Sequence, residues 1–166
     1  MNEYPWYGLA NGEELQQGDL LFGCPTDSVA PSLEAERQDF DIVVVSHSCD
    51  LAHGKLESVQ VCPFWDLERL ANKVEYFRSK RGKEELRRGN LPGYHLLNRS
   101  ELPEKPSDFR VIDFRMQFAV KFELLKALAS VQKPRLRLLS PYREHLAQSL
   151  ARFYMRVGLP VDIAAF

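Results

Sequence analysis

A run of branched residues that stops abruptly in five polar ones constrains this chain more than any other feature. Val43, Val44 and Val45 favour a strand, because β-branched side chains prefer extended backbone. Residues 46–50, Ser-His-Ser-Cys-Asp, then bring hydroxyl, imidazole, thiol and carboxylate groups together. A strand fixes geometry and the loop after it gives access, so we expect a functional site at this strand end.

Size and composition are typical of one globular domain. The chain has 166 residues, 45% of them hydrophobic, which suits a single domain over 1–166. No apolar run approaches the roughly 18–20 residues that cross a bilayer, and Met1–Trp6 lacks the pattern of a signal peptide. An odd number of cysteines, three, does not make a disulfide framework. We expect a cytoplasmic protein outside the membrane.

The net charge of −1 hides a strong asymmetry along the chain. Residues 1–66 hold 12 acidic and 2 basic residues, a balance of −10, and residues 67–166 hold 11 acidic and 20 basic, a balance of +9. A bipolar surface would attract RNA or an acidic protein partner to its basic side. Alternatively, the two halves neutralise one another inside the fold, and sequence charge does not separate these alternatives.

Hydrophobic periodicity predicts strands first and helices later. We expect strands at 18–25, 40–45 and 56–62, separated by a polar loop at 26–38, and Pro63 ends the third strand. Later segments are a helical, basic insertion at about 66–92, extended pieces at 94–97, 109–114, 116–122 and 136–139, a loop at 102–108, and a short helix at 123–129.

A helix over about 140–157 ends the predicted fold. Ser140 is its expected N-cap, and Pro141 occupies the first helical position. Its apolar face holds Leu146, Leu150, Phe153 and Val157. The order of elements favours an α+β fold: a small, strongly bent antiparallel sheet or barrel with a helical insertion and a C-terminal helix.

Several short motifs resemble a known family. They are Gln17–Leu21, Ile42–Ser46, Val59–Val61 and a late strand at Val111–Asp113 before a terminal helix. This order resembles the PemK/MazF-like small-barrel proteins of prokaryotes, and the resemblance implies a toxin–antitoxin endoribonuclease or antiviral defence role. It also implies a basic residue before the second strand and a hydroxyl at its end, which Arg37 and Ser46 match. A second resemblance, to small prokaryotic proteins with a Ser-x-x-Cys-Asp strand end, implies no function.

Two kinds of catalysis fit the strand end. In general acid–base cleavage of RNA, Arg37 would hold a phosphate, His47 would move protons, and Ser46 would bond the phosphate or the 2′-hydroxyl. In nucleophilic catalysis, Cys49 would attack, with a nearby imidazole as base and Asp50 orienting it. The structural alternative is a polar strand end that caps its own loop.

A zinc site is a further hypothesis. Cys24, Cys49 and Cys62 each lie near a predicted strand end, and His47 lies two residues from Cys49, which puts both on one face of extended backbone. Three thiolates and one imidazole would make a closed tetrahedral site. Free cysteines also serve as small buried hydrophobes, so the sequence leaves both alternatives open.

Basic residues gather within the predicted insertion. This segment offers a nucleic-acid-binding surface made of Arg78, Lys80, Arg81, Lys83, Arg87 and Arg88. Tyr76 and Phe77 could stack on bases, although Phe77 also completes a helical apolar stripe. The expected function is toxin- or defence-type work on nucleic acid, such as endoribonuclease activity. The alternative is a non-catalytic, zinc-stabilised protein-interaction module, and either could be a homodimer.

Overall fold

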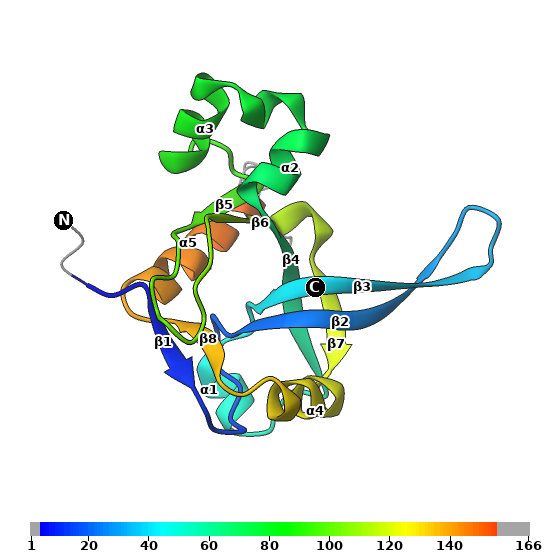
Figure 1. Cartoon of the computed structure of the whole chain (residues 1–166). Coiled ribbons are helices and arrows are strands. Elements are labelled where there is room, and N and C mark those ends of the chain that lie inside the picture. Colours follow the sequence, from blue (N-terminus) through cyan, green and yellow to red (C-terminus); the bar gives the residue numbers. More distant parts are fainter. Residues whose placement is uncertain (1–3, 156–166) are drawn as a thin grey trace, which may run out of the picture.

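An open, bent antiparallel sheet organises the protein (Figure 1). The computed structural model describes residues 4–155, with backbone only at 28 and 29. The strands lie in the order β2 (Leu20–Val29), β3 (Ala35–Val44), β4 (Ser58–Asp66), β6 (Arg110–Asp113) and β5 (Tyr94–Leu97), and β7 (Phe118–Lys121) pairs with the start of β4. The predicted α+β class is confirmed, as a bent sheet and not as a closed barrel.

The bend lies in β4, which changes partners along its length. Its first part pairs with β7, its middle with β3, and residues 64–66 with β6. The prediction that Pro63 ends this strand is wrong. Proline lacks an N–H donor, but here it is the last residue of β4 paired with β3, opposite Ile42, and the strand continues through residues 64–66, which pair with β6.

A second, smaller sheet packs beside the first. It pairs β1 (Tyr7–Ala10) with β8 (Arg135–Leu138) in antiparallel register. The sequence analysis predicted an extended segment near β8 and no strand at β1. An isolated bridge between Asp19 and Arg137 joins the two sheets, so residues far apart in sequence meet here.

Helices cover the sheets and build the insertion. The insertion is confirmed as helical and consists of α2 (Leu67–Lys73), the 3-10 turn η1 (Glu75–Arg78) and α3 (Lys80–Arg87). The remaining helical elements are α1 (Ser48–Ala52), η2 (Phe114–Met116), α4 (Phe122–Val131) and α5 (Tyr142–Tyr154). No helix within residues 4–155 has the length and apolar character needed to span a membrane.

The C-terminal helix begins one residue later than expected. Pro141, not Ser140, occupies the N-cap position of α5. Leu146 and Tyr142 are its buried residues, whereas Phe153 is half-buried against the core. The buried residues of the helix therefore lie nearer its N-terminus than the sequence suggested. Residues 156–157 of the predicted helix lie outside the described range.

Alternate side chains along β3 and β4 belong to two separate hydrophobic cores. Val43 and Cys62 belong to one core, which α5 covers, and Ile42 and Val61 belong to another, which α4 covers. Successive side chains of a strand point to opposite faces, so one sheet can serve both cores. A third, small core under the insertion contains Phe77, which is buried as its helical stripe predicted and is not available for base stacking.

The polar segment at 26–38 is a hairpin arm, not a loop. Here β2 and β3 remain paired from Cys24 opposite Phe40 to Val29 opposite Ala35, and the arm extends well away from the other elements (Figure 1). Side chains at 31–39 are exposed. Both faces of these strands lie in solvent, so no alternation of apolar and polar residues predicts them. Cross-strand pairs of opposite charge, such as Asp27 opposite Arg37, are compatible with the hairpin.

Candidate functional site

The polar strand end that the sequence singled out mainly holds its own backbone. The Ser46 hydroxyl accepts a hydrogen bond from the Gln60 amide at 2.8 Å, and His47 Nδ1 accepts one from the Cys49 amide at 3.4 Å. His47 is the N-cap of α1, and Asp50 lies exposed in the first turn. These contacts match the structural alternative, in which the strand end caps its own loop.

Arg37 does not belong to this strand end. It lies on the exposed arm beside Asp39, at 3.8 Å, seven residues before Val44 at the end of β3. A strand rises about 3.3 Å per residue, so roughly 20 Å or more separates Arg37 from Ser46. The predicted catalytic set of Arg37, Ser46, His47 and Asp50 is therefore not assembled, because the arm is a strand and not a loop that folds back.

The predicted zinc ligands are also separated. Cys24 and Cys62 are buried in different cores, whereas Cys49 is exposed on α1. Burial raises the pKa of Cys24 to about 11 and that of Cys62 to about 12, so both stay protonated thiols at neutral pH. Within the described part of the chain, no group of three His, Cys, Asp or Glu side chains could hold a metal ion. The structure therefore does not bring the predicted ligands together, because Cys24 and Cys62 belong to different cores and Cys49 lies on α1.

The basic segment of the insertion divides into different roles. Arg78 donates to the carbonyls of Ala71 and Asn72, each at 2.8 Å, and so closes the end of α2. Lys80 and Arg81 are exposed at the start of α3, and Lys83 lines a shallow cavity with Asp66 and Asp108. Only Arg87 and Arg88 reach the cavity described next.

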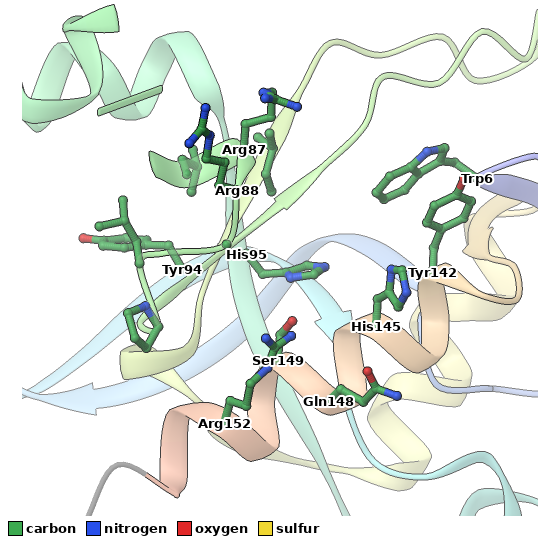
Figure 2. A pocket seen from close by; sticks show the side chains of 15 residues that line it. Trp6, Arg87, Arg88, Tyr94, His95, Tyr142, His145, Gln148, Ser149 and Arg152 are labelled. Atoms are coloured by element: carbon green, nitrogen blue, oxygen red, sulfur yellow. The ribbon is translucent and has the colours of Figure 1, made fainter. Parts of the chain in front are cut away.

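A cavity of about 460 Å³ lies between α3, β5 and α5 (Figure 2). We call it the α3/α5 cavity. Its charged lining residues are all arginines, and no Asp or Glu lines it. Leu86, Leu91, Pro92 and Leu96 contribute apolar surface. Its polar and aromatic lining residues are Trp6, Arg87, Arg88, Tyr94, His95, Tyr142, His145, Gln148, Ser149 and Arg152.

One face of α5 forms the cavity wall. His145, Gln148, Ser149 and Arg152 follow at spacings of three, one and three, which places them on the same side of a helix. Leu146 points instead into the core. The sequence analysis named only the apolar face of this helix and missed His145, although the i, i+3, i+4, i+7 spacing of these four residues can be read from the sequence.

His95 enters the cavity from β5. Alternation along the strand sends Tyr94 and Leu96 toward the small core under the insertion and His95 to the other side, toward α5. His95 and His145 approach one another from the two elements (Figure 2). This pair could not be predicted from sequence, because fifty residues separate the two histidines and only the packing of α5 brings them together.

His95 is the most perturbed group of the cavity. Burial, followed by the nearby His145 and Arg152, lowers its pKa from 6.5 to about 4. Its Nε2 atom is buried and has no hydrogen-bond partner among residues 4–155. Buried polar atoms are nearly always paired, so an unpaired imidazole nitrogen beside a cavity marks a place where a ligand can bind.

The arginines on α3 are held in place by one carboxylate. Glu84 accepts from Arg87 at 2.7 Å and from Arg88 at 2.6 Å. Hydrogen bonds from Arg87 and then Arg88 lower the pKa of Glu84 to about 2, so it stays ionised. At the opposite end, Trp6 and Tyr142 stack with ring centroids 3.7 Å apart, which gives the cavity a flat aromatic wall.

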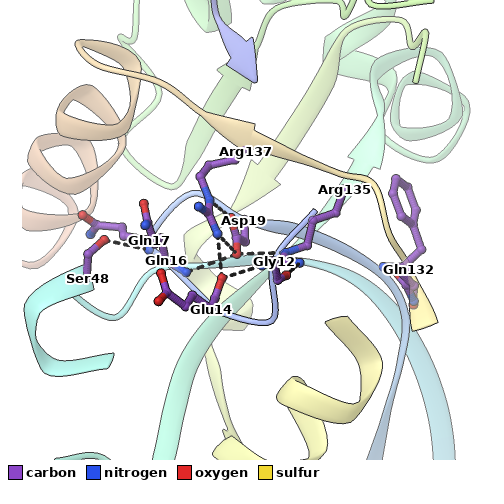
Figure 3. A network of polar contacts seen from close by, with 10 residues as sticks. Gly12, Glu14, Gln16, Gln17, Asp19, Ser48, Gln132, Arg135 and Arg137 are labelled. Carbon is purple, nitrogen blue, oxygen red and sulfur yellow. Dashed lines mark hydrogen bonds and ion pairs between the residues drawn. The ribbon is translucent and has the colours of Figure 1, made fainter. Parts of the chain in front are cut away.

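A buried ionic network lies below the second sheet (Figure 3). Asp19, fully buried, accepts from Arg135 at 3.0 Å and also pairs with Arg137. Arg135 donates to the carbonyls of Gly12 at 2.8 Å and Glu14 at 2.5 Å. The network fixes the segment before β2, which borders a second cavity.

That second cavity adjoins the strand end. It measures about 550 Å³, and its lining includes Ser48, Cys49 and His53. Ser48 accepts a hydrogen bond from the Gln17 amide at 3.0 Å, and His53 Nδ1 lies 2.6 Å from the carbonyl oxygen of Cys49 (Figure 3 shows the Gln17–Ser48 contact). Its charged residues have both signs, Glu13 and Glu14 against Lys126. Ser48 and His53 are already bonded to the backbone, and the charged residues have both signs, which favours the α3/α5 cavity as the candidate site.

Comparison of the sequence with known protein families and with curated proteins gave no match.

Proposed function

We propose that this protein binds single-stranded RNA in the α3/α5 cavity. The observation that carries the proposal is the lining itself: Arg87, Arg88 and Arg152 face a cavity without a carboxylate. Arginine is suited to phosphate, because its planar guanidinium donates two parallel hydrogen bonds. The proposal keeps the nucleic-acid-directed function that the sequence suggested and moves it from the end of β3 to the helices.

The aromatic wall favours single-stranded RNA over duplex RNA as the ligand. Splayed bases stack on aromatic rings, and the Trp6–Tyr142 pair offers such a surface beside the arginines. Gln148 and Ser149 add neutral donors and acceptors on the same helix face, which suit base edges or a ribose hydroxyl. The arginines would hold the RNA backbone while the aromatic pair stacks on a base, so together they could bind one short segment of RNA.

Binding is tested with a fluorescent single-stranded RNA of about 12 nucleotides. We expect Arg87→Ala and Arg152→Ala each to raise Kd about tenfold at low salt, as loss of a phosphate contact should. Arg81→Ala is the matched control, since Arg81 lies on the same helix as Arg87 but outside the cavity.

Two results would contradict the proposal. The unmutated protein could fail to bind the RNA at low salt. Alternatively, Arg81→Ala could weaken binding as much as Arg87→Ala, which would assign the affinity to a general basic surface.

A second candidate function, cleavage of the bound strand, is favoured by the two facing imidazoles. His95 is neutral at pH 7 and so can take the proton of a ribose 2′-hydroxyl. The 2′-oxygen would attack the adjacent phosphorus, the bond from phosphorus to O5′ would break, and His145 would protonate the leaving O5′. The products are a 2′,3′-cyclic phosphate and a 5′-hydroxyl, and no metal takes part.

Cleavage is tested by following end-labelled RNA in the presence of EDTA. We expect discrete cuts that His145→Ala abolishes while its Kd for RNA changes less than about twofold. His145 is exposed, so its replacement should leave the fold intact. RNA that stays intact with the unmutated protein over a range of pH would leave binding as the function and reject the cleavage step.

A further inference from the structure

The hairpin arm presents an acidic surface, and its side chains at 31–39 are exposed. Residues 25–41 hold five acidic residues and one basic residue, a balance of −4. Only residues 42–44 of β3 pair with β4, so the outer part of β3 has one edge free within the described chain. The arm points away from α3 and α5 of its own chain (Figure 1). It can therefore meet another molecule without rearrangement.

The tip of the arm carries an exposed apolar side chain. Leu33 is 85% exposed and has a φ of 65°. Left-handed backbone is unfavourable for a leucine, and exposure of its side chain to water is unfavourable as well. A neighbouring acid, Glu34, completes the tip. An exposed apolar side chain next to one carboxylate, at the end of a free hairpin, is a surface that a partner can bury.

The α3/α5 cavity has the complementary surface. Its floor is apolar, with Leu86, Leu91 and Leu96, and its charged residues are arginines only. Leu33 can pack on these leucines, and the Glu34 carboxylate beside it can meet the arginine side chains. The acidic arm and the arginine-lined cavity therefore lie at separate places on one molecule, although ion pairs such as Asp19 with Arg135 also join the acidic and basic halves of the sequence.

We infer that the hairpin arm of one copy docks, through Leu33 and the exposed carboxylates of the arm, Glu34 and Asp39, into the α3/α5 cavity of a second copy. Because the cavity is the proposed RNA site, arm docking and RNA binding exclude each other. The docked arm then limits access to the cavity at high protein concentration. The inference rests on the cavity and the arm, and it holds whether or not RNA is the ligand.

Sedimentation velocity over a range of protein and salt concentrations tests this docking. We expect self-association at low salt that high salt suppresses. The arm variant Glu34→Lys/Asp39→Lys and the cavity variant Arg88→Glu/Arg152→Glu should each weaken it about tenfold or more. Mixing the two reversed variants should restore association, because a basic arm then meets an acidic cavity. Leu33→Ser should weaken association without changing the charge.

The outcomes separate this inference from simpler accounts. If the acidic side chains only keep an exposed strand edge from pairing, the chain stays monomeric at low salt and the inference is overturned. An arm variant that dissociates the protein while the cavity variants do not would place the docking surface elsewhere, and this also overturns it. Arg152→Glu alone, on the exposed face of α5, serves if the double variant disturbs α3, as circular dichroism would reveal.

RNA binding distinguishes this failure from failure of the proposed function. With both correct, RNA dissociates the assembly and the arm variant binds RNA more tightly at high protein concentration. A monomer that binds RNA overturns the docking alone. Salt-sensitive association without RNA binding overturns the RNA function alone.

Discussion

Two arginine-rich regions of this protein differ in how their charges are satisfied. In the network below the second sheet, Arg135 is 1% exposed, and both Asp19 and backbone carbonyls bond it. In the α3/α5 cavity, Arg152 is exposed, and a buried imidazole nitrogen has no partner among the described residues. A buried charge whose bonds are all made within the chain holds structure, whereas open charges beside an unpaired polar atom are suited to a ligand.

The largest expected effect comes from the buried network. Asp19→Ala leaves Arg135 buried without its carboxylate, and loss of one partner of such a pair costs roughly 3–5 kcal/mol. Urea unfolding at pH 7 measures the change. Arg152→Ala is the matched control and should alter the free energy of unfolding by less than about 0.5 kcal/mol. Equal effects of the two variants would break the distinction between a structural and a ligand-binding region.

The next effect is a pH dependence from His95. Its folded pKa of about 4 lies below the usual 6.5, so the unfolded chain takes up the proton first as pH falls. This contribution to stability is complete above pH 6.5 and is lost as the pH drops toward 4, by at most about 3 kcal/mol. Urea unfolding at pH 7 and pH 4.5 should show a smaller pH-dependent loss in His95→Gln than in the unmutated protein.

His145→Ala is the control for this pH dependence. His145 is exposed, so most of the pH-dependent loss should remain when it is replaced. A loss that is the same in His95→Gln as in the unmutated protein would show that His95 is not desolvated, and with it the picture of an unpaired buried imidazole would fail.

A smaller effect should appear in the salt dependence of RNA binding. Each phosphate contact to a single strand contributes about 0.7 to the slope of log affinity against log salt. Arg152→Ala should reduce that slope by about this amount, whereas Arg137→Ala should not, because Arg137 is committed to Asp19. Titrations at several salt concentrations measure both. A change of slope in Arg137→Ala would show that the buried network also contributes to RNA binding, and the contrast between the two regions would then fail.

The smallest effect is expected at the strand end that the sequence favoured. His47→Ala removes an N-cap contact on a short helix and should cost about 1 kcal/mol of stability. It should leave RNA affinity and RNA integrity unchanged, as measured in the same binding and cleavage assays. Loss of either would return the site to the end of β3.

Sequence patterns predicted much of the fold where one face of an element is buried. The strand at Val43–Val45, the insertion and the C-terminal helix carried clear periodicity, and all three are present. The arm was missed because both its faces meet solvent, so no hydrophobic pattern marks it. The continuation of β4 through Pro63 was missed because a change of strand partner depends on β6, far along the chain.

Most residues of the candidate site could not be predicted from the sequence. Arg87 and Arg88 were identified from composition, since a basic run is visible without a structure. His95 and His145 were not, because the environment of a lone histidine depends on what packs against it. The cysteines looked like ligands because each lies near a predicted strand end, but Cys24 and Cys62 are buried in separate cores and Cys49 lies on α1.

The sequence by itself determined the class of fold, the helical insertion and the polarity of charge along the chain. Local periodicity and composition contain that information, because each element needs one buried face. Only the tertiary structure decided which charges are neutralised and which remain open to a ligand. Asp19 meets Arg135, and His95 meets α5, across distances in sequence that no local pattern records.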